Sequence, residues 1–349
     1  MPRPSLSPVV GLALAVLLGL TACSGSGPAD DAAVPSSRTA DASPAPTTSA
    51  TPGGAYDQYV ALGDSYTSGP FVPLVRLDPV GCARSTSNYP AYVAELLRVG
   101  SYTDVSCQGA ETADMTATQD TGFGTNVPQL DAVTADTDLV TLGIGGNDFG
   151  IFAQLTQTCS RLAQQDPAGA PCRASFERGG TDTLLGRTEE VGDRVAAVLA
   201  EVARRAPDAE VVVVGYPRIL PASGTCPTVP FAAGDYAWAS DVERSLNGSL
   251  RRAAEGSGAT YVDTFGPSRE HSACAGDDAW INGSELDAER ALSFHPFREG
   301  MQATASEVVE ALTGRVERAT TPYDSGAPTM STADQKQLAA RLAGAAPAS

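Results

Sequence analysis

Lysine and histidine are scarce in this sequence. Lys336 is the single lysine among its 349 residues, and there are two histidines. The body of the chain therefore lacks the lysine needed for a Schiff base or for a phosphate-binding glycine–lysine pair. Acidic residues number 41 against 23 basic ones, which gives a net charge of −18. A surface this acidic repels phosphate backbones, so we expect no nucleic-acid partner.

The N-terminal residues carry the pattern of an export signal. Residues 9–20 form an almost unbroken apolar run that follows Arg3 and is shorter than a membrane span needs. The run ends at Leu20-Thr21-Ala22-Cys23, which resembles a bacterial lipobox. We therefore predict a signal peptide over residues 1–23 and a lipid on Cys23, with an ordinary cleavage site or an uncleaved anchor as the alternatives. The protein is then exported, either secreted or held at the outer face of the membrane.

Composition divides the rest of the chain into three parts. Residues 24–54 are mainly Ser, Pro, Ala, Thr, Asp and Gly, which bury too little apolar surface to fold, so we predict a disordered linker. Residues 55–315 have the composition of a globular domain. Beyond it the chain turns small and polar again, and we expect residues 316–349 to form a flexible tail.

Six cysteines follow Cys23, an even number that indicates disulfides in an exported protein. No two are spaced as Cys-x-x-Cys, which excludes zinc-ribbon and redox motifs. Six cysteines allow 15 pairings in principle, and pairing between neighbours is the simplest of them. That pairing is Cys82–Cys107, Cys159–Cys172 and Cys226–Cys274. The sequence offers no cluster of metal ligands, and we expect neither a metal nor an organic cofactor.

Short β-forming runs alternate with helical patterns along the globular part. The runs predicted as strands are 58–62, 102–106, 138–142, 210–215 and 260–263, and the predicted helices are 89–99, 188–205, 236–254 and 296–312. The central strands are nearly all apolar, which favours an α/β fold with a parallel sheet covered by helices on both faces.

Two irregular segments, 152–182 and 217–234, interrupt this alternation. Each follows a predicted strand, at the end of the sheet where open α/β folds bind ligands. We therefore expect both segments to form the walls of a cleft.

Ser65 is a candidate nucleophile because the first strand runs directly into Gly63-Asp64-Ser65. Most such tripeptides are only solvated turns, so the assignment depends on partners elsewhere in the chain. A nucleophilic serine needs a base, and the choice lies between His271, in a polar loop, and His295, directly before a proline.

Hydrogen-bond donors for an oxyanion follow the next two strands. Gly109 comes after the second strand, and Gly145-Gly146-Asn147-Asp148 comes after the third. Glycine allows a backbone N–H to approach a substrate closely, and Asn147 offers a side-chain amide. The block is not a dinucleotide fingerprint, because Asp148 stands where the third glycine belongs.

The ordered set Gly-Asp-Ser at 63–65, Gly109, Gly-x-Asn-Asp at 145–148 and His295 resembles the SGNH (GDSL-type) hydrolase superfamily. The resemblance covers residues 57–313 and is strongest to secreted actinobacterial esterases and lipases with three disulfides. It implies a three-layer α/β/α fold with a flavodoxin-like, five-stranded parallel sheet. It also implies Ser65 as the nucleophile and His295 as the base, with Ser65, Gly109 and Asn147 as the oxyanion hole.

One position departs from the superfamily pattern. Leu292 stands where many members have an aspartate three residues before the catalytic histidine, and the nearest acids are Glu289 and Asp287. The resemblance to the actinobacterial branch implies a main-chain carbonyl instead, that of Leu292 or Ser293, accepting from Nδ1 of His295. A carbonyl there fixes the tautomer and leaves Nε2 free to act as a base.

These observations favour an exported serine ester hydrolase of esterase or lipase type, acting through an acyl-enzyme on Ser65. We expect it to be a monomer with a small-molecule or lipid ester as substrate. The alternatives are a carbohydrate O-acetylesterase on the same fold and a non-catalytic surface binding protein.

Overall fold

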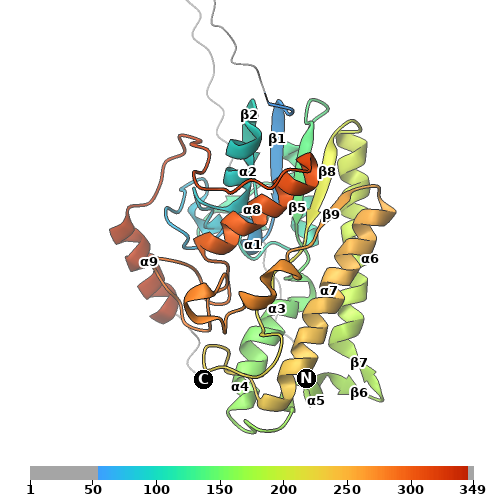
Figure 1. The fold of residues 1–349 in the computed structure, drawn as a ribbon, viewed down its shortest axis with the longest axis vertical. Helices are drawn as coiled ribbons and strands as arrows, with labels where there is room; N and C mark the ends of the chain where they lie inside the picture. The colour runs from blue at the N-terminus through green and yellow to red at the C-terminus, as the bar shows by residue number, and fades with distance from the viewer. Residues whose placement is uncertain (1–53, 345–349) are drawn as a thin grey trace, which may run out of the picture. The chain divides into compact units, whose positions relative to one another are not determined.

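The central element is a five-stranded parallel sheet (Figure 1). The computed structural model describes residues 54–344, so the predicted signal peptide, Cys23 and nearly all of the predicted linker lie outside the described residues. The strand order is β2-β1-β5-β8-β9, and every neighbouring pair is parallel. The strands are β1 (Gln58–Gly63), β2 (Ser101–Asp104), β5 (Leu139–Gly143), β8 (Glu210–Val214) and β9 (Thr260–Val262).

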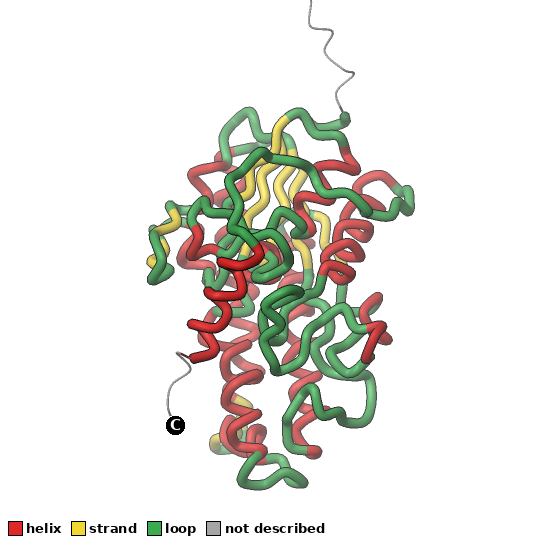
Figure 2. Tube along the Cα trace, turned by 90° about the vertical axis from the view of Figure 1, so that its left-hand side faces the viewer, coloured by secondary structure: helices red, strands yellow, loops and turns green. Residues whose placement is uncertain are grey.

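Helices cover both faces of this sheet, which confirms the three-layer prediction. In β1, Tyr59 and Ala61 face one helical layer, whereas Val60 and Leu62 face the other. The first layer contains α2 (Tyr89–Leu97) and α8 (Arg298–Thr313), and the second contains α6 (Thr183–Arg205) and α7 (Tyr236–Gly256). Alternation along the strand thus divides the apolar side chains between two cores. Figure 2 shows the strands side by side between the helices.

The helix boundaries follow capping signals. Helix α6 begins five residues earlier than the apolar periodicity predicts, because the Asp182 carboxylate caps it by accepting from the N–H groups of Leu184 and Leu185, both at 3.0 Å. Helix α2 ends at Leu97, since Arg98 adopts a left-handed conformation with φ of 53°.

Most of the remaining elements are short. The helices are α1 (Ser65–Ser68), α3 (Ile151–Ala153), α4 (Ser160–Ala163), α5 (Pro171–Phe176) and α9 (Thr332–Gly344), with a π-helical turn over Gln154–Cys159. Two small antiparallel hairpins pair β3 (Gln119–Asp120) with β4 (Thr125–Asn126), and β6 (Glu177–Arg178) with β7 (Thr181–Asp182). Among the described helices, none is both long and apolar enough to cross a membrane.

Three disulfides close loops around the sheet. They join Cys82 to Cys107, Cys159 to Cys172 and Cys226 to Cys274, which confirms the predicted pairing. Removing a disulfide of this kind typically costs about 2–5 kcal/mol of stability.

The C-terminal segment differs from the prediction of a flexible tail over residues 316–349. Its backbone bonds to the globular domain, since the N–H of Tyr323 donates to the Ala91 carbonyl at 2.9 Å and the N–H of Met330 donates to the Val75 carbonyl at 2.7 Å. Gln335, on α9, is 1% exposed and donates through Nε2 to the carbonyls of Phe71 (2.9 Å) and Ala288 (3.1 Å). A buried amide with two partners holds α9 in place, and nothing in the local composition signals this long-range contact.

Candidate active site

Ser65 begins helix α1 immediately after β1 ends. The Asp64 carboxylate caps this one-turn helix, because its Oδ1 accepts from the N–H of Tyr66 at 2.9 Å. The helix stops at Gly69, which adopts a left-handed conformation with φ of 71°. Asp64 therefore shapes the turn that presents Ser65 rather than contacting a histidine.

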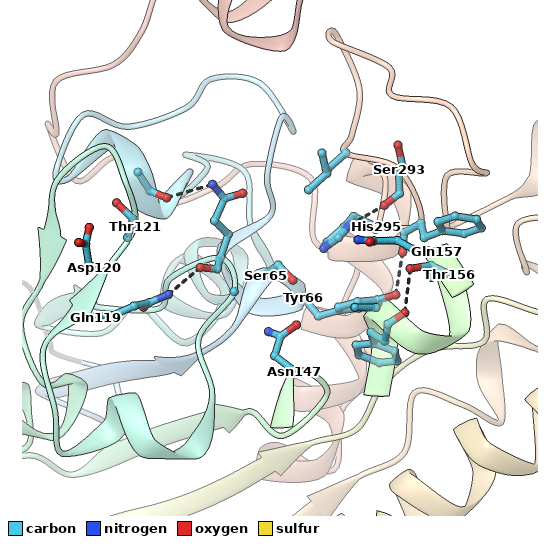
Figure 3. Close-up of a pocket in the computed structure, with 17 residues that line it drawn as sticks. Ser65, Tyr66, Gln119, Asp120, Thr121, Asn147, Thr156, Gln157, Ser293 and His295 are labelled. Carbon is cyan, nitrogen blue, oxygen red and sulfur yellow. Dashed lines mark hydrogen bonds between the residues drawn. The ribbon is translucent and has the colours of Figure 1, made fainter. Parts of the chain in front are cut away.

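A pocket of about 470 Å³ brings together the four residues singled out by the motifs (Figure 3). Ser65, Gly109, Asn147 and His295 all line it, although they come from separate segments of the chain. Three of these segments follow β1, β2 and β5, whose carboxyl ends meet at one edge of the sheet.

His271, the other candidate base, lies elsewhere. Its ring stacks on Trp280 with centroids 4.1 Å apart, and its Nδ1 is 2.7 Å from the carbonyl oxygen of Asp278. It does not line the pocket that contains Ser65. The structure therefore leaves His295 as the candidate base.

The His295 ring is oriented by a main-chain carbonyl. Its Nδ1 lies 2.7 Å from the oxygen of Ser293, whereas the Leu292 carbonyl accepts from the backbone N–H of His295 at 3.1 Å. The two nearby acids have other partners, since Asp287 accepts from the N–H of Glu289 and Glu289 pairs with Lys336 at 2.8 Å. Of the two carbonyls that the sequence left open, the one in contact is that of Ser293.

The surroundings of His295 favour the neutral imidazole. Its ring packs on Tyr66, with centroids 5.1 Å apart. Burial lowers the pKa of His295 to about 4, although the Ser293 carbonyl raises it in part. The ring is therefore uncharged near neutral pH. Within the described residues, no hydrogen bond joins it to the Ser65 hydroxyl, a contact that apo enzymes often close only around substrate.

Three hydrogen-bond donors are available beside Ser65. Among the described residues, no carbonyl or side chain accepts from the backbone N–H of Ser65 or of Gly109, which has φ of 74°. The Asn147 amide donates one N–H to the Ala110 carbonyl at 3.0 Å and retains a second. Three donors from three strand ends form an arrangement suited to a developing oxyanion.

The Tyr216 side chain links the turn of Ser65 to the loop that carries Asn147, a role that the sequence analysis missed. Its buried hydroxyl donates to Asp64 Oδ2 at 2.5 Å and accepts from the Gly146 N–H at 2.8 Å. Burial raises the pKa of Asp64 to about 7, against the lowering effect of the hydrogen bond from Tyr216. Tyr216 follows the end of β8 by two residues. That position was the one available signal, because no motif marks the residue.

Asp148 fixes the segment that carries Asn147. Its buried carboxylate accepts from the N–H of Thr112 at 2.9 Å, from the Thr112 hydroxyl at 2.5 Å and from Arg194 at 2.8 Å. These contacts tie the Asn147 loop to helix α6, on which Arg194 lies.

The prediction that segment 217–234 forms a wall of the cleft is wrong. Phe152, Ala153, Thr156 and Gln157 line the pocket, as expected for the segment 152–182, but no residue of 217–234 does. The opposite wall comes instead from the start of the β3–β4 hairpin, which the sequence analysis did not predict. Two-residue strands carry too little periodicity to be recognised.

Comparison with known proteins bears on this site directly. A model of the GDSL-like Lipase/Acylhydrolase family matches residues 61–303. The chain belongs to this family. Lipase 2 of Streptomyces coelicolor is 36% identical over 323 residues, which cover 89% of this chain and 99% of that protein.

Two solved structures match this GDSL-family hydrolase over about three quarters of its length. Phospholipase A1 from Streptomyces albidoflavus aligns with a TM-score of 0.62 and 29% identity, covering 74% of this chain and 99% of that one. The extracellular lipase from Streptomyces rimosus aligns with a TM-score of 0.55 and 28% identity, covering 76% and 100%. The protein is therefore a carboxylic-ester hydrolase with the SGNH fold, and the resemblance inferred from the motifs is confirmed.

Charged groups are few around the pocket. Asp120 is the only carboxylate among the described residues that line it, and none of them is lysine or arginine. Across residues 54–344, no group of three or more His, Cys, Asp and Glu side chains is placed to hold a metal ion.

Proposed function

We propose that this hydrolase cleaves carboxylic esters through an acyl-enzyme on Ser65, with His295 as the base. Ser65 Oγ attacks the ester carbonyl carbon while His295 Nε2 takes the hydroxyl proton. The N–H groups of Ser65 and Gly109 and the Asn147 amide then stabilise the oxyanion. The bond to the alcohol breaks as His295 returns the proton to the leaving oxygen. Water attacks the acyl-enzyme in the same way, which releases the acid and restores Ser65.

The observation that carries this proposal is the convergence of Ser65, Gly109, Asn147 and His295 in one pocket. The low pKa of His295 supports its role, because a neutral imidazole can accept a proton. The contact between Nδ1 and the Ser293 carbonyl supports the remaining requirement, since it leaves Nε2 without a proton.

Intact mass after exposure to a serine-directed organophosphate tests the nucleophile. We expect one adduct on the wild type and none on Ser65→Ala, and Ser306→Ala, on the remote part of α8, is the control that keeps the adduct. An adduct that persists in Ser65→Ala, or a folded wild type that takes none, contradicts the proposal.

The orienting group is tested by replacing the two nearby acids. In the carbonyl arrangement, Asp287→Asn and Glu289→Gln keep kcat within about twofold of the wild type, because neither side chain holds His295. A loss of 100-fold or more, as expected on removing a triad acid, contradicts the carbonyl arrangement.

We also propose that the protein is exported, monomeric and attached to the outer face of the membrane through a lipid on Cys23. Three disulfides support export, because such bonds persist in oxidising compartments. In a bacterial host, Cys23→Ala should move the protein from the membrane fraction to the medium, and light scattering should give the mass of one chain.

Rates on nitrophenyl esters from acetate to palmitate, measured beside the rate on acetylated xylan, separate esterase, lipase and carbohydrate deacetylase activity.

A further inference from the structure

The backbone turn that carries His295 has a strained residue in it. The N–H of His295 donates to the Leu292 carbonyl at 3.1 Å, which closes a turn over residues 292–295. Phe294, the third residue of this turn, has φ of 59°. A left-handed conformation at that position favours glycine, because a residue with a Cβ is strained there. The turn therefore needs contacts from the surrounding protein to keep this form.

The orientation of the His295 ring depends on the same turn. Its Nδ1 lies 2.7 Å from the oxygen of Ser293, the residue before Phe294. Because Phe294 separates this carbonyl from the ring that it orients, the backbone of Phe294 determines how the two meet. If the turn relaxed and the carbonyl moved away, Nδ1 would lose the acceptor that keeps its proton there.

One side of the turn is bound to the chain segment at Asn282. The N–H of Phe294 donates to the Gly283 carbonyl, and the N–H of Asn282 donates to the His295 carbonyl, both at 2.9 Å. The Asn282 amide also donates to the Leu292 carbonyl at 3.3 Å. None of these three bonds uses the Phe294 carbonyl.

The Tyr66 hydroxyl binds the turn from the side of the nucleophile. It donates to the Phe294 carbonyl at 2.7 Å, from a buried side chain that directly follows Ser65 in the chain. In the described part of the chain, one further bond joins these two segments, from the N–H of Leu292 to the Pro70 carbonyl at 3.0 Å. Of the two bonds, the one from Tyr66 can be removed by substitution without a change in the backbone.

The Tyr66 side chain is itself held in place. Its ring centroid lies 5.1 Å from that of His295 and 5.2 Å from those of Phe152 and Tyr216, and Figure 3 shows the Tyr66 ring below that of His295. The N–H of Tyr66 donates to the Asp64 carboxylate at 2.9 Å. Burial raises the pKa of Tyr66 well above its ordinary value, so the hydroxyl keeps the proton that it donates.

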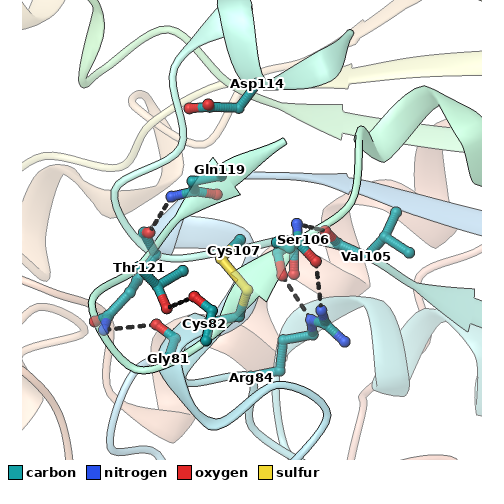
Figure 4. The surroundings of a disulfide bond; sticks show 12 residues. Gly81, Cys82, Arg84, Val105, Ser106, Cys107, Asp114, Gln119 and Thr121 are labelled. Atoms are coloured by element: carbon teal, nitrogen blue, oxygen red, sulfur yellow. Dashed lines mark hydrogen bonds between the residues drawn. A yellow bond between two sulfur atoms is a disulfide. The ribbon is translucent and has the colours of Figure 1, made fainter. Parts of the chain in front are cut away.

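The two sides of the active site are anchored in different ways. The segment that carries Gly109 is held covalently, because the Cys82–Cys107 disulfide lies two residues before it (Figure 4). None of the three disulfides in the described chain lies within residues 282–297. The turn that carries His295 therefore depends on hydrogen bonds, and the loss of one should affect the ring.

We infer that Tyr66 is a positioning residue for His295. Its hydroxyl holds the Phe294 carbonyl, which keeps the Ser293 carbonyl on Nδ1 and leaves Nε2 without a proton. The inference rests on the proposed function, in which Nε2 accepts the proton of Ser65. It gives the nucleophile turn a second role, because the residue after Ser65 also fixes the tautomer of the base.

Tyr66→Phe tests the inference, because it removes the hydroxyl and keeps the ring. We expect kcat on nitrophenyl butyrate to fall roughly tenfold. KM should stay within about twofold of the wild type, since the hydroxyl proton is already held by the Phe294 carbonyl. Tyr59→Phe is the matched control, because Tyr59 is also buried and its hydroxyl lies 2.8 Å from Thr141 Oγ1, outside the pocket. The control should keep kcat.

The tautomer of His295 gives a readout that a loss of stability alone does not move. The chain has two histidines, so nitrogen NMR of the full chain, isotope-labelled in histidine, reports two rings, and His271→Gln assigns them. In the wild type near neutral pH, without ester, we expect the His295 proton on Nδ1. In Tyr66→Phe a second form with the proton on Nε2 should appear, whereas Tyr59→Phe should keep the wild-type pattern.

Several outcomes overturn the inference while the enzyme remains active. A wild-type ring with its proton on Nε2 does so without any variant, and so does wild-type kcat in a folded Tyr66→Phe. A lower kcat with the proton still on Nδ1 would assign the effect to packing. A raised KM at constant kcat would place the hydroxyl against the substrate. A His295→Gln enzyme that keeps its kcat contradicts the proposed function instead.

Discussion

Replacing Tyr216 with phenylalanine tests whether one hydroxyl group aligns the nucleophile with the oxyanion donors. The hydroxyl bridges Asp64, which caps the turn of Ser65, and Gly146, which precedes Asn147. Phenylalanine keeps the ring, which packs edge-on against Tyr66 and Phe152. The substitution therefore removes the bridge and little else.

The expected magnitude follows from what the substitution leaves behind. Asp64 Oδ2 and the Gly146 N–H both become buried groups without a partner, and each such group costs about 1–3 kcal/mol. We expect the free energy of unfolding to fall by about 2–6 kcal/mol, which is the sum for the two groups. Part of this cost is relieved when the turn of Ser65 and the loop of Gly146 move. This movement misplaces catalytic groups, which lowers kcat by roughly 10- to 100-fold. KM should change little, because Tyr216 does not line the pocket that holds the ester.

The assay is kcat and KM on nitrophenyl butyrate, with urea unfolding to measure stability. Tyr59→Phe is the matched control, because Tyr59 is equally buried and loses a hydrogen bond of 2.8 Å to Thr141 near the start of β1. The control should lose stability but keep kcat. A folded Tyr216→Phe enzyme with wild-type kcat refutes the bridging role, and an equal loss of kcat in Tyr59→Phe would assign the effect to stability alone.

Three further predictions concern pH and packing. Because the pKa of His295 is about 4, kcat/KM should stay constant from pH 8 to about 5 and fall to half near pH 4, rather than near the ordinary value of about 6.5. Burial raises the pKa of Glu243 to about 8, so the folded protein binds more protons than the unfolded one between pH 4 and 8, and stability falls as pH rises through that window. In Glu243→Gln, the free energy of unfolding should fall by a few kcal/mol less than in the wild type between pH 5 and pH 9, as measured by urea unfolding. An equal fall in both proteins would contradict the raised pKa of Glu243. A Cβ at Gly146 would overlap the ring of Phe152. Gly146→Ala should therefore lower the melting temperature and reduce kcat at least about tenfold. An unchanged melting temperature would contradict this prediction, because it would mean that the Phe152 ring moves aside without cost.

The sequence predicts the layers of the fold and the members of the site for the same reason. All the candidate residues except His295 follow a strand with a strong local signal, and parallel strands in one sheet bring their carboxyl ends together. Ser65, Gly109 and Asn147 could therefore be assigned to one edge without knowledge of any long-range contact. The neighbour pairing of the cysteines also depends on short loops, with separations of 25, 13 and 48 residues.

Features that depend on distant contacts were not predictable in this way. Tyr216 meets Asp64 across 152 residues, and Gln335 meets Phe71 across 264. Neither contact leaves a periodic or compositional trace, because a single hydrogen bond between buried groups constrains only two positions. The wall contributed by Gln119 and Asp120 was missed for a related reason, since its strands have only two residues each.

The missing acid beside His295 is physically consistent with the rest of the site. A neutral carbonyl on Nδ1 fixes the tautomer but supplies no negative charge, so burial is free to lower the pKa of the imidazole to about 4. So weak a base removes the serine proton less readily, and the barrier must be lowered elsewhere. In the proposed mechanism, the oxyanion donors then carry more of the catalysis, and we expect their alignment to depend on the Tyr216 hydroxyl between Asp64 and Gly146. A carboxylate on Nδ1 of the histidine would make catalysis depend less on the oxyanion donors. Loss of the Tyr216 hydroxyl should therefore lower kcat more in this protein than loss of an equivalent hydroxyl in relatives that have such a carboxylate.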